Sequence, residues 1–265
     1  MSRLRTDLKR LLGRLPDRQP ASGATLLTYH RVGGGSSDEL DVSLPDFRAQ
    51  MAELSRHRVV RLDEALDALD RGDSAPRVVL TFDDGFADLH AHAWPLLREA
   101  QLPFTVYLAS GFVGGRMTWD GATAKATDAP ALSWDQLREM VGSGLCTIGN
   151  HTHRHVRPER LSEAELDLCT DSLLSLLDVV PAHFAFPWGV PVPALERALR
   201  ARFRSAATGR VGRNLPGTDR MLLNRVPVRR TDPIEFFRAK LDGRLLPERT
   251  YAAVVATAKR AGARA

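Results

Sequence analysis

Two adjacent aspartates, Asp83 and Asp84, directly follow the apolar run of residues 77–82 and precede a glycine. An Asp-Gly pair is a common turn signal, which accounts for one carboxylate but not for both. Adjacent carboxylates at a partly buried strand end raise each other's pKa unless a cation neutralises them or their environments differ. A metal ion that takes one carboxylate as a ligand and leaves the other free meets that requirement.

Further candidate ligands lie in the segment 149–155, GNHTHRH, which follows another predicted strand. His151 and His155 are four residues apart, which in a helical turn places both imidazoles on one side, as in paired metal ligands. His153 does not share that side. Alone, this spacing is more typical of a solvated loop, but the two aspartates at a strand end favour a metal site. One carboxylate and two imidazoles leave coordination positions open, as a catalytic zinc requires.

Such a site predicts metal-assisted hydrolysis, in which the metal polarises a carbonyl and a neighbouring carboxylate accepts a proton from water. Hydrolysis also needs an acid for the leaving group and a donor for the oxyanion. His30, at the end of the apolar segment 26–29, is a candidate acid. A backbone N–H next to Pro187 is a candidate oxyanion donor, with Trp188 as a wall. Each of these two signals has a structural alternative, a strand-end histidine or a simple turn.

Short apolar runs alternate with helical patterns from Ala24 onward. The expected strands span residues 24–29, 57–62, 77–82, 104–109, 145–149, 183–186, 203–208 and 224–228. The clearest helical patterns cover residues 43–54, 133–141 and 162–178. Ser133 with Gln136 and Ser162 with Glu165 have the spacing of capping boxes. Strands that alternate with helices predict a parallel sheet, and seven or eight of them predict a barrel whose active site lies at the carboxyl ends of the strands.

The composition predicts one core, because 265 residues with 43% hydrophobic content suit a single α/β domain, which we assign to residues 24–265. The chain has 37 Lys and Arg residues and 32 Asp and Glu residues. The resulting net charge of +5 favours contact with anionic groups such as phosphates or membrane headgroups. Cys146 and Cys169 lack CxxC spacing, which argues against a disulfide or a cysteine zinc site and fits a reducing cytosol.

The amino terminus, residues 1–16, is predicted to be a basic amphipathic helix, with leucines at helical spacing among arginines and a lysine. Its apolar runs are too short for a signal-peptide core or a membrane span. The helix either docks on the domain, which we favour, or lies on an anionic membrane leaflet. Residues 17–23 are predicted to be a linker, so residues 1–23 form a separate unit of helix and linker.

Together these motifs resemble the polysaccharide deacetylases of carbohydrate esterase family 4, the NodB homology domain, over roughly residues 26–228. Residues 81–85, Thr-Phe-Asp-Asp-Gly, resemble the family's first motif, which implies Asp83 as general base and Asp84 as metal ligand. Residues 151–155 resemble the second motif, His-Ser/Thr-x-x-His. This implies His151 and His155 as the other ligands and Thr152 as a hydroxyl that braces the loop. The family fold is a distorted (β/α)₇ barrel, which agrees with the alternation of strands and helices.

Two motifs depart from the family pattern. The third motif, Arg-x-Pro-Tyr, is replaced by residues 185–188, Ala-Phe-Pro-Trp, which lack the arginine that orients the base. Arg225 is the candidate replacement, by analogy with relatives that also lack that arginine. The usual carboxyl-terminal Leu-x-His is absent, since no histidine follows His183. In the branch that deacetylates poly-N-acetylglucosamine, an early Tyr-His supplies the acid, and Tyr29 with His30 resembles it.

The resemblance implies removal of an N-acetyl or related acyl group from an amino-sugar-containing glycan or glycan precursor. Zn²⁺ is the expected metal, with Co²⁺, Ni²⁺ and Fe²⁺ as alternatives. We expect a cytoplasmic protein whose substrate is an oligosaccharide or a nucleotide- or lipid-linked amino sugar, and Trp119, Trp134 and Trp188 are candidates for stacking on it. Three alternatives stay open: an inactive glycan-binding member of the family, an O-deacetylase or deformylase, and a basic membrane-associated or nucleic-acid-binding protein. We expect no nucleic-acid partner, because the sequence shows no helix-turn-helix, zinc finger or aromatic RNA-binding motif.

Overall fold

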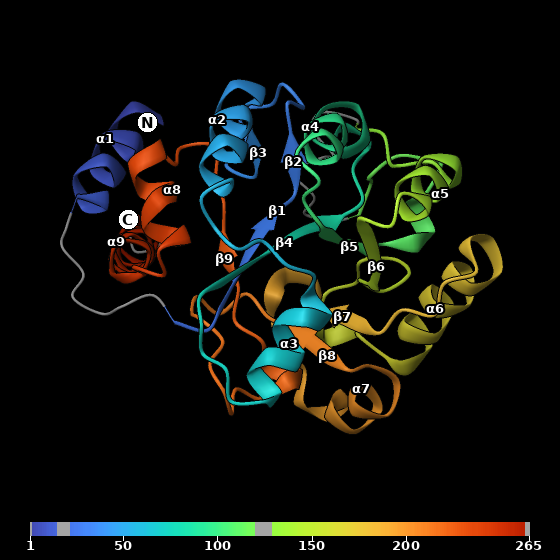
Figure 1. Cartoon of the computed structure of the whole chain (residues 1–265). Coiled ribbons are helices and arrows are strands. Elements are labelled where there is room, and N and C mark those ends of the chain that lie inside the picture. The colour runs from blue at the N-terminus through green and yellow to red at the C-terminus, as the bar shows by residue number, and fades with distance from the viewer. Residues whose placement is uncertain (1, 15–21, 120–128, 263–265) are drawn as a thin grey trace.

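The computed structural model describes residues 2–14, 22–119 and 129–262. Its centre is a seven-stranded sheet in which all paired neighbours run parallel, curled into a half-barrel (Figure 1). The strands, in their order across the sheet, are β8 (Ser205–Ala207), β7 (His183–Ala185), β6 (Cys146–Asn150), β5 (Phe104–Leu108), β4 (Arg77–Asp84), β1 (Ala24–Tyr29) and β9 (Val226–Pro227). The predicted distorted barrel of seven parallel strands is confirmed.

The helices of the described residues surround this sheet (Figure 1). They are α1 (Ser2–Gly13), α2 (Leu44–Leu54), α3 (Leu62–Asp70), α4 (Trp94–Glu99), α5 (Trp134–Gly142), α6 (Glu163–Leu177), α7 (Glu196–Arg202), α8 (Ile234–Leu241) and α9 (Leu246–Gly262). A short parallel pair, β2 (Arg31–Val32) and β3 (Asp41–Val42), follows β1.

Strand β4 is buried on both faces, which explains why its sequence is apolar without interruption before the aspartates. Val78, Leu80 and Phe82 belong to the large core cluster beneath the outer helices. Val79 belongs to a smaller cluster inside the barrel, which α3 closes at the amino-terminal ends of the strands. Because successive side chains of a strand point to opposite faces, Asp83 continues the inner row and points into the barrel.

Two local predictions are wrong. No strand forms at residues 57–62, where Val59 makes only an isolated bridge with Val78, because β5 occupies this edge of β4 from Leu80 onward and leaves only its amino-terminal end free. The capping box expected at Ser162 does not form either, since the Glu165 carboxylate binds Arg154 instead. The capping box at the start of α5 is confirmed, with both of its hydrogen bonds present.

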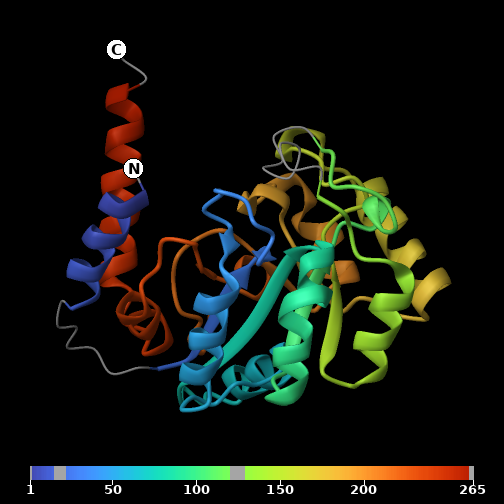
Figure 2. The same cartoon turned by 90° about the horizontal axis from the view of Figure 1, so that it is seen from above.

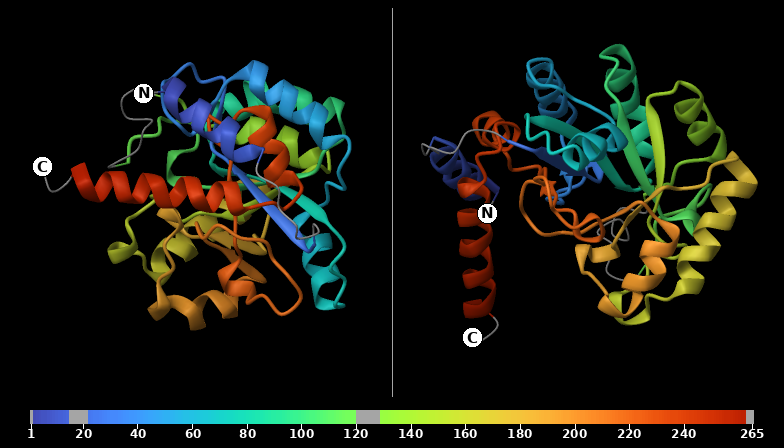
Figure 3. Two further views of the ribbon diagram at one scale, coloured as in Figure 1. Left: turned by 90° about the vertical axis from the view of Figure 1, so that its left-hand side faces the viewer. Right: turned by 60° about the horizontal axis from the view of Figure 1, so that its bottom comes forward.

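Helices α1, α8 and α9 lie together beside the β9 edge of the half-barrel, and α9 extends away from the barrel (Figures 2 and 3). Leu12 of α1 packs in a small apolar cluster with Phe236 of α8 and Tyr251 of α9. Residue 1 and residues 15–21, which include most of the predicted linker and the end of the predicted helix, lie outside the described ranges. No helix in the described part of the chain is long and apolar enough to cross a membrane.

Candidate metal centre and active site

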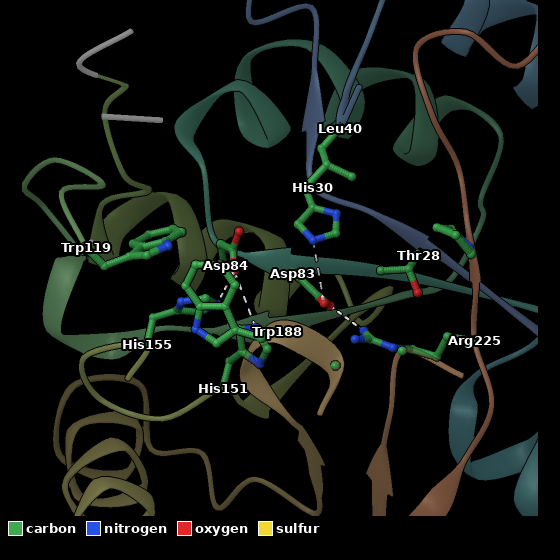
Figure 4. Close-up of a pocket in the computed structure, with 13 residues that line it drawn as sticks. Thr28, His30, Leu40, Asp83, Asp84, Trp119, His151, His155, Trp188 and Arg225 are labelled. Carbon is green, nitrogen blue, oxygen red and sulfur yellow. Dashed lines mark hydrogen bonds and ion pairs between the residues drawn. The ribbon is translucent and has the colours of Figure 1, made fainter. Parts of the chain in front are cut away.

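Most of the predicted site residues line one pocket of about 300 Å³ at the carboxyl ends of the strands, whereas Thr152 and Pro187 are not part of its lining (Figure 4). Asp83 and Asp84 end β4, and His30 directly follows β1. His151 and His155 lie in the loop after β6. Arg225, just before β9, and Trp188, in the turn after β7, complete the lining. In a parallel barrel the carboxyl ends of all strands meet at one rim, so segments far apart in the sequence share this pocket.

The backbone around the pocket is strained. Asp84, Thr152, His155 and Trp188 all have positive φ angles, of 75°, 68°, 48° and 63°. Non-glycine residues rarely adopt this conformation, and it gathers at functional sites where the surrounding structure enforces it. At Asp84 it breaks the alternation of β4, which would otherwise send this side chain to the face opposite Asp83. Both carboxylates therefore line the same pocket, where they face different partners.

Asp84 faces the two imidazoles. Its Oδ1 atom lies 3.4 Å from Nε2 of His151 and 3.3 Å from Nε2 of His155, and the three ligand atoms lie within 4.8 Å of one another. All three side chains are buried. The His151 Nδ1–H donates to the Ala185 carbonyl at 2.8 Å, which leaves Nε2 with its lone pair toward Asp84. Asp84 Oδ1 accepts no hydrogen bond within the described chain. Three acceptors that face one another in this way form a site for a cation.

The electrostatics of the three side chains fit a metal site. Burial opposes ionisation of Asp84, but His155 and His151 outweigh it and hold the pKa of Asp84 far below its ordinary value. Burial lowers the pKa of His155 to about 4, so this imidazole is neutral near pH 7. Burial also acts against protonation of His151, but the Asp84 and Asp83 carboxylates outweigh it and raise its pKa. A carboxylate and two imidazole nitrogens in buried, partly strained surroundings are a donor set that suits a divalent metal.

Asp83 has a separate set of partners. Arg225 Nη1 donates to its Oδ1 at 2.6 Å, and His30 Nε2 lies 4.0 Å from its Oδ2 (Figure 4). Arg225 is itself held by a hydrogen bond from Nε to the Thr208 carbonyl and lies 5.7 Å from the centroid of the Tyr107 ring. Burial raises the pKa of Asp83, but the Arg225 guanidinium and the nearby imidazoles outweigh it, so this pKa lies below its ordinary value. A guanidinium from a distant segment of the chain thus contacts Asp83.

The turn after β7 contains Pro187 and places the next residue, Trp188, at the pocket. Pro187 is buried, whereas Trp188 is 40% exposed, and its ring centroid lies 5.5 Å from that of His155. Gly189 N–H donates to the Phe186 carbonyl within this turn. Pro187 has no N–H and the Phe186 N–H donates to the Ala207 carbonyl at 3.0 Å, so the N–H next to Pro187 that the sequence nominated is the one of Trp188.

The Thr152 hydroxyl does not brace the loop as expected, since it has no hydrogen-bond partner among the residues that the structure describes. Instead, Asn150 Oδ1 accepts from the Thr152 backbone N–H at 2.8 Å, and Asn150 Nδ2 donates to the Leu166 carbonyl at 2.8 Å. Asn150 was missed by sequence reasoning, although its place at the last position of a buried strand before the histidines is a usable signal.

Trp119 packs on the metal site from another side. Its ring centroid lies 4.4 Å from that of the His155 ring, so this tryptophan packs against a candidate metal ligand. Trp134, the third tryptophan considered for stacking, begins α5 and packs against the large core cluster, and it does not line the pocket.

Comparison with known proteins agrees with this site. The family model "Polysaccharide deacetylase" matches residues 70–201. The structure of IcaB from Ammonifex degensii superposes with a TM-score of 0.71 at 30% sequence identity, over 83% of this chain and 97% of that one. This chain therefore belongs to the polysaccharide deacetylase family, of the carbohydrate esterase family 4 or NodB type. The resemblance stated from the sequence is confirmed.

Two further relatives show the range of the likeness. The poly-beta-1,6-N-acetyl-D-glucosamine N-deacetylase of Staphylococcus epidermidis is 27% identical over 149 residues, which cover 50% of this chain and 49% of that protein. The Streptococcus pyogenes deacetylase PplD, solved in complex with acetate, has a TM-score of 0.69 at 21% identity over 84% of this chain and 99% of that one, and shows the shared fold. The chain spans about half the length of the curated relatives it matches.

Proposed function

We propose that this protein is a metal-dependent hydrolase that removes an N-acetyl or related acyl group from an amino-sugar-containing glycan or glycan precursor. The observation that supports the proposal most directly is that the two adjacent carboxylates have different partners. Asp84 faces His151 and His155, whereas Asp83 faces Arg225 and His30. Both pairs open on the same pocket, so a ligand-holding carboxylate and a proton-accepting carboxylate serve one substrate.

Asp84, His151 and His155 would hold the divalent metal, with Zn²⁺ as the first candidate and Co²⁺, Ni²⁺ or Fe²⁺ as alternatives. When bound there, the metal supplies a Lewis acid that polarises the acyl carbonyl and lowers the pKa of water. Asp83 is ionised at neutral pH, because Arg225 holds its pKa low, and it accepts the proton of the attacking water. Arg225 also fixes the carboxylate in the direction of the pocket.

His30 donates a proton to the departing amine. Its Nε2 lies 4.0 Å from Asp83, so one pocket wall carries the base and the acid side by side. The Trp188 N–H stabilises the oxyanion that develops on the acyl oxygen, and the partly exposed Trp188 ring lines the place of the sugar. The absence of the third-motif arginine favours the alternative of an inactive glycan-binding member. The contact of Arg225 with Asp83 counts against that alternative, because it provides a guanidinium for the base.

The decisive experiment compares wild type with Asp83→Asn in the same preparations. Metal content is measured by mass spectrometry, and acyl release is measured on a panel of N-acetylated, O-acetylated and N-formylated sugars. We expect about one metal per chain in both proteins and a loss of turnover in Asp83→Asn by roughly a factor of 10² to 10⁴, the scale of a general base. Turnover of only the O-acetyl or formyl compounds would replace the N-deacetylase proposal. Equal turnover in both proteins would remove Asp83 from its role.

A cytoplasmic location and a peripheral contact of residues 1–16 with anionic membrane remain predictions. On α1, Leu4 and Leu11 are 76% and 66% exposed, which supports the membrane contact. Sedimentation with vesicles of anionic and of neutral lipid tests it, and Leu4→Ser with Leu11→Ser should abolish a difference between the two lipids. Cell fractionation tests the location.

A further inference from the structure

A second cleft adjoins the metal pocket. Its volume is about 810 Å³, and it shares Trp119 and His155 with the pocket. The loop that carries the second motif and the start of α6 form much of its lining, including Arg154, Arg157 and Arg160. The cleft is thus a continuation of the place where the acylated sugar would bind.

The charge of this cleft is unbalanced. Glu165 is the acidic residue of its lining within the described chain, and Arg154 neutralises it through two contacts of 2.7 Å, from Nε and Nη2 to Oε1. The other Glu165 oxygen accepts from the Arg154 backbone N–H at 2.9 Å. Arg157 and Arg160 are exposed, and neither has a carboxylate within ion-pair distance in the described ranges. Two positive charges therefore face the cleft without a counter-charge.

Arg157 stands close to the metal ligands. Its guanidinium carbon lies 4.9 Å from the centroid of the Trp188 ring, whose other contact is the His155 ring at 5.5 Å. One indole thus lies between the guanidinium and a candidate metal ligand, so Arg157 is one aromatic ring away from the metal site. Ser162 adds a hydroxyl to the same lining, and this hydroxyl is not used to cap α6.

Resting on the proposed function, we propose that Arg157 and Arg160 form an anion subsite and that the acylated sugar carries a diphosphate or phosphate next to it. Guanidinium groups bind phosphate oxygens in a bidentate way, and each such charge-assisted contact is strong. Two unpaired guanidinium groups match the two negative charges of a diphosphate diester or a phosphate monoester better than the single charge of a carboxylate. Nucleotide-linked and lipid-linked amino sugars both present this chemistry.

Four variants test the subsite: Arg157→Gln, Arg160→Gln, the double variant, and Arg48→Gln as a control. Arg48 is an exposed arginine of α2 that lines neither cavity, so the control removes the same charge elsewhere. The substrates are UDP-N-acetylglucosamine, a polyprenyl-diphosphate-linked N-acetylglucosamine in detergent, a neutral N-acetylglucosamine oligomer, and an oligomer that contains a uronic acid. The measured quantity is the ratio of kcat/KM for each charged substrate to that for the neutral oligomer.

We expect the ratio for a diphosphate substrate to fall roughly tenfold in each single variant, mainly through KM, the scale of one charge-assisted hydrogen bond. Arg48→Gln should keep the wild-type ratio. The better diphosphate substrate in wild type identifies the nucleotide or the lipid as its source. An unchanged ratio in the double variant overturns the subsite, and a stronger preference for the uronic acid overturns its assignment to phosphate.

Pyrophosphate binding by calorimetry separates this inference from the proposed function. If no acyl group is released from any substrate but pyrophosphate binds and the double variant weakens it about tenfold or more, the subsite stands and the hydrolase proposal fails. If the neutral oligomer is hydrolysed while pyrophosphate binds to wild type and to the double variant equally, the hydrolase stands and the subsite fails.

Discussion

Two buried charge clusters of this protein differ in how their charge is balanced. Where α1 meets α8, Asp232 is enclosed by two ammonium groups, with Lys9 Nζ 2.7 Å from Oδ1 and Lys240 Nζ 2.6 Å from Oδ2. At the end of β4, Asp84 is equally buried, but its Oδ1 faces the acceptor nitrogens of His151 and His155 and accepts no hydrogen bond from the described residues. The first cluster is neutralised by the chain itself, and the second needs a cation from outside.

This difference teaches how one protein uses burial for two purposes. Removing a charge from water costs several kcal/mol unless partners compensate it, so the paired cluster fastens one helix to another without offering a binding site. The Lys9 ammonium also lies 4.3 Å from the centroid of the Tyr251 ring, which joins α9 to the same junction. In the metal site, Asp84 Oδ1 accepts no hydrogen bond from the described residues, so part of this cost remains and becomes affinity for a divalent ion.

Asp84→Ala should have the largest effect, because it removes the only carboxylate ligand of the proposed set. We expect metal content to fall from about one per chain to near zero and acyl release to fall by roughly a thousandfold or more, since several kcal/mol of transition-state stabilisation depend on the metal. Mass spectrometry and acetate release are the measurements, with circular dichroism as the check on folding. Full metal occupancy in this variant would rule out Asp84 as a ligand.

Asp232→Asn should act on the other cluster alone. It leaves the buried Lys9 ammonium with Glu39 at 3.8 Å and the buried Lys240 ammonium with Glu248 at 3.0 Å, so the free energy of unfolding should fall by about 3 kcal/mol, as measured by urea denaturation. Lys9→Met, in which Asp232 keeps Lys240, should cost less. Metal content below the unfolding transition should match wild type in both variants. A loss of metal in Asp232→Asn would contradict the independence of the two clusters.

The pH dependence of the free energy of unfolding tests how the charge of Asp232 is balanced in the paired cluster. Burial opposes ionisation of Asp232, but Lys240 and Lys9 outweigh it and lower its pKa to about 2. A carboxyl group with a lowered pKa in the folded state stabilises the protein fully above its unfolded pKa of about 3.9 and loses this contribution as pH falls toward about 2. The contribution at neutral pH is on the order of 2–3 kcal/mol.

Urea denaturation of metal-free wild type and Asp232→Asn between pH 6 and pH 2.5 measures this contribution. The difference in unfolding free energy between the two proteins should be constant at the upper end and narrow below about pH 3.9. A difference that stays constant down to pH 2.5 would show that Asp232 does not titrate as the ion pairs require.

Arg225→Lys should have the smallest effect. Lysine keeps a positive charge near Asp83 but loses the planar fork that also reaches the Thr208 carbonyl. We expect metal content to stay at the wild-type level and kcat to fall roughly tenfold, about 1.4 kcal/mol in activation free energy. The acidic limb of the pH profile should move to higher pH, because the pKa of Asp83 rises as its partner weakens. An unchanged profile would make Arg225 a structural residue only.

The sequence by itself determined the local features of this protein. The buried run of β4 followed by Asp83 and Asp84, and the loop with His151 and His155, were all evident from residue type and spacing. So was a barrel-type parallel sheet, because strand and helix periods alternate along the chain. These features depend on neighbours within a few residues, so short stretches of sequence are enough to predict them.

Tertiary structure alone decided the contacts between distant segments. Arg225 meets Asp83 across 142 positions of sequence, and Lys9 meets Asp232 across 223, distances over which no periodic pattern carries information. The same applies to Arg157, whose missing counter-charge is visible only once Glu165 is seen to bind Arg154. The sheet order brings these side chains together, and burial then determines whether each charge is paired within the chain or left for a ligand.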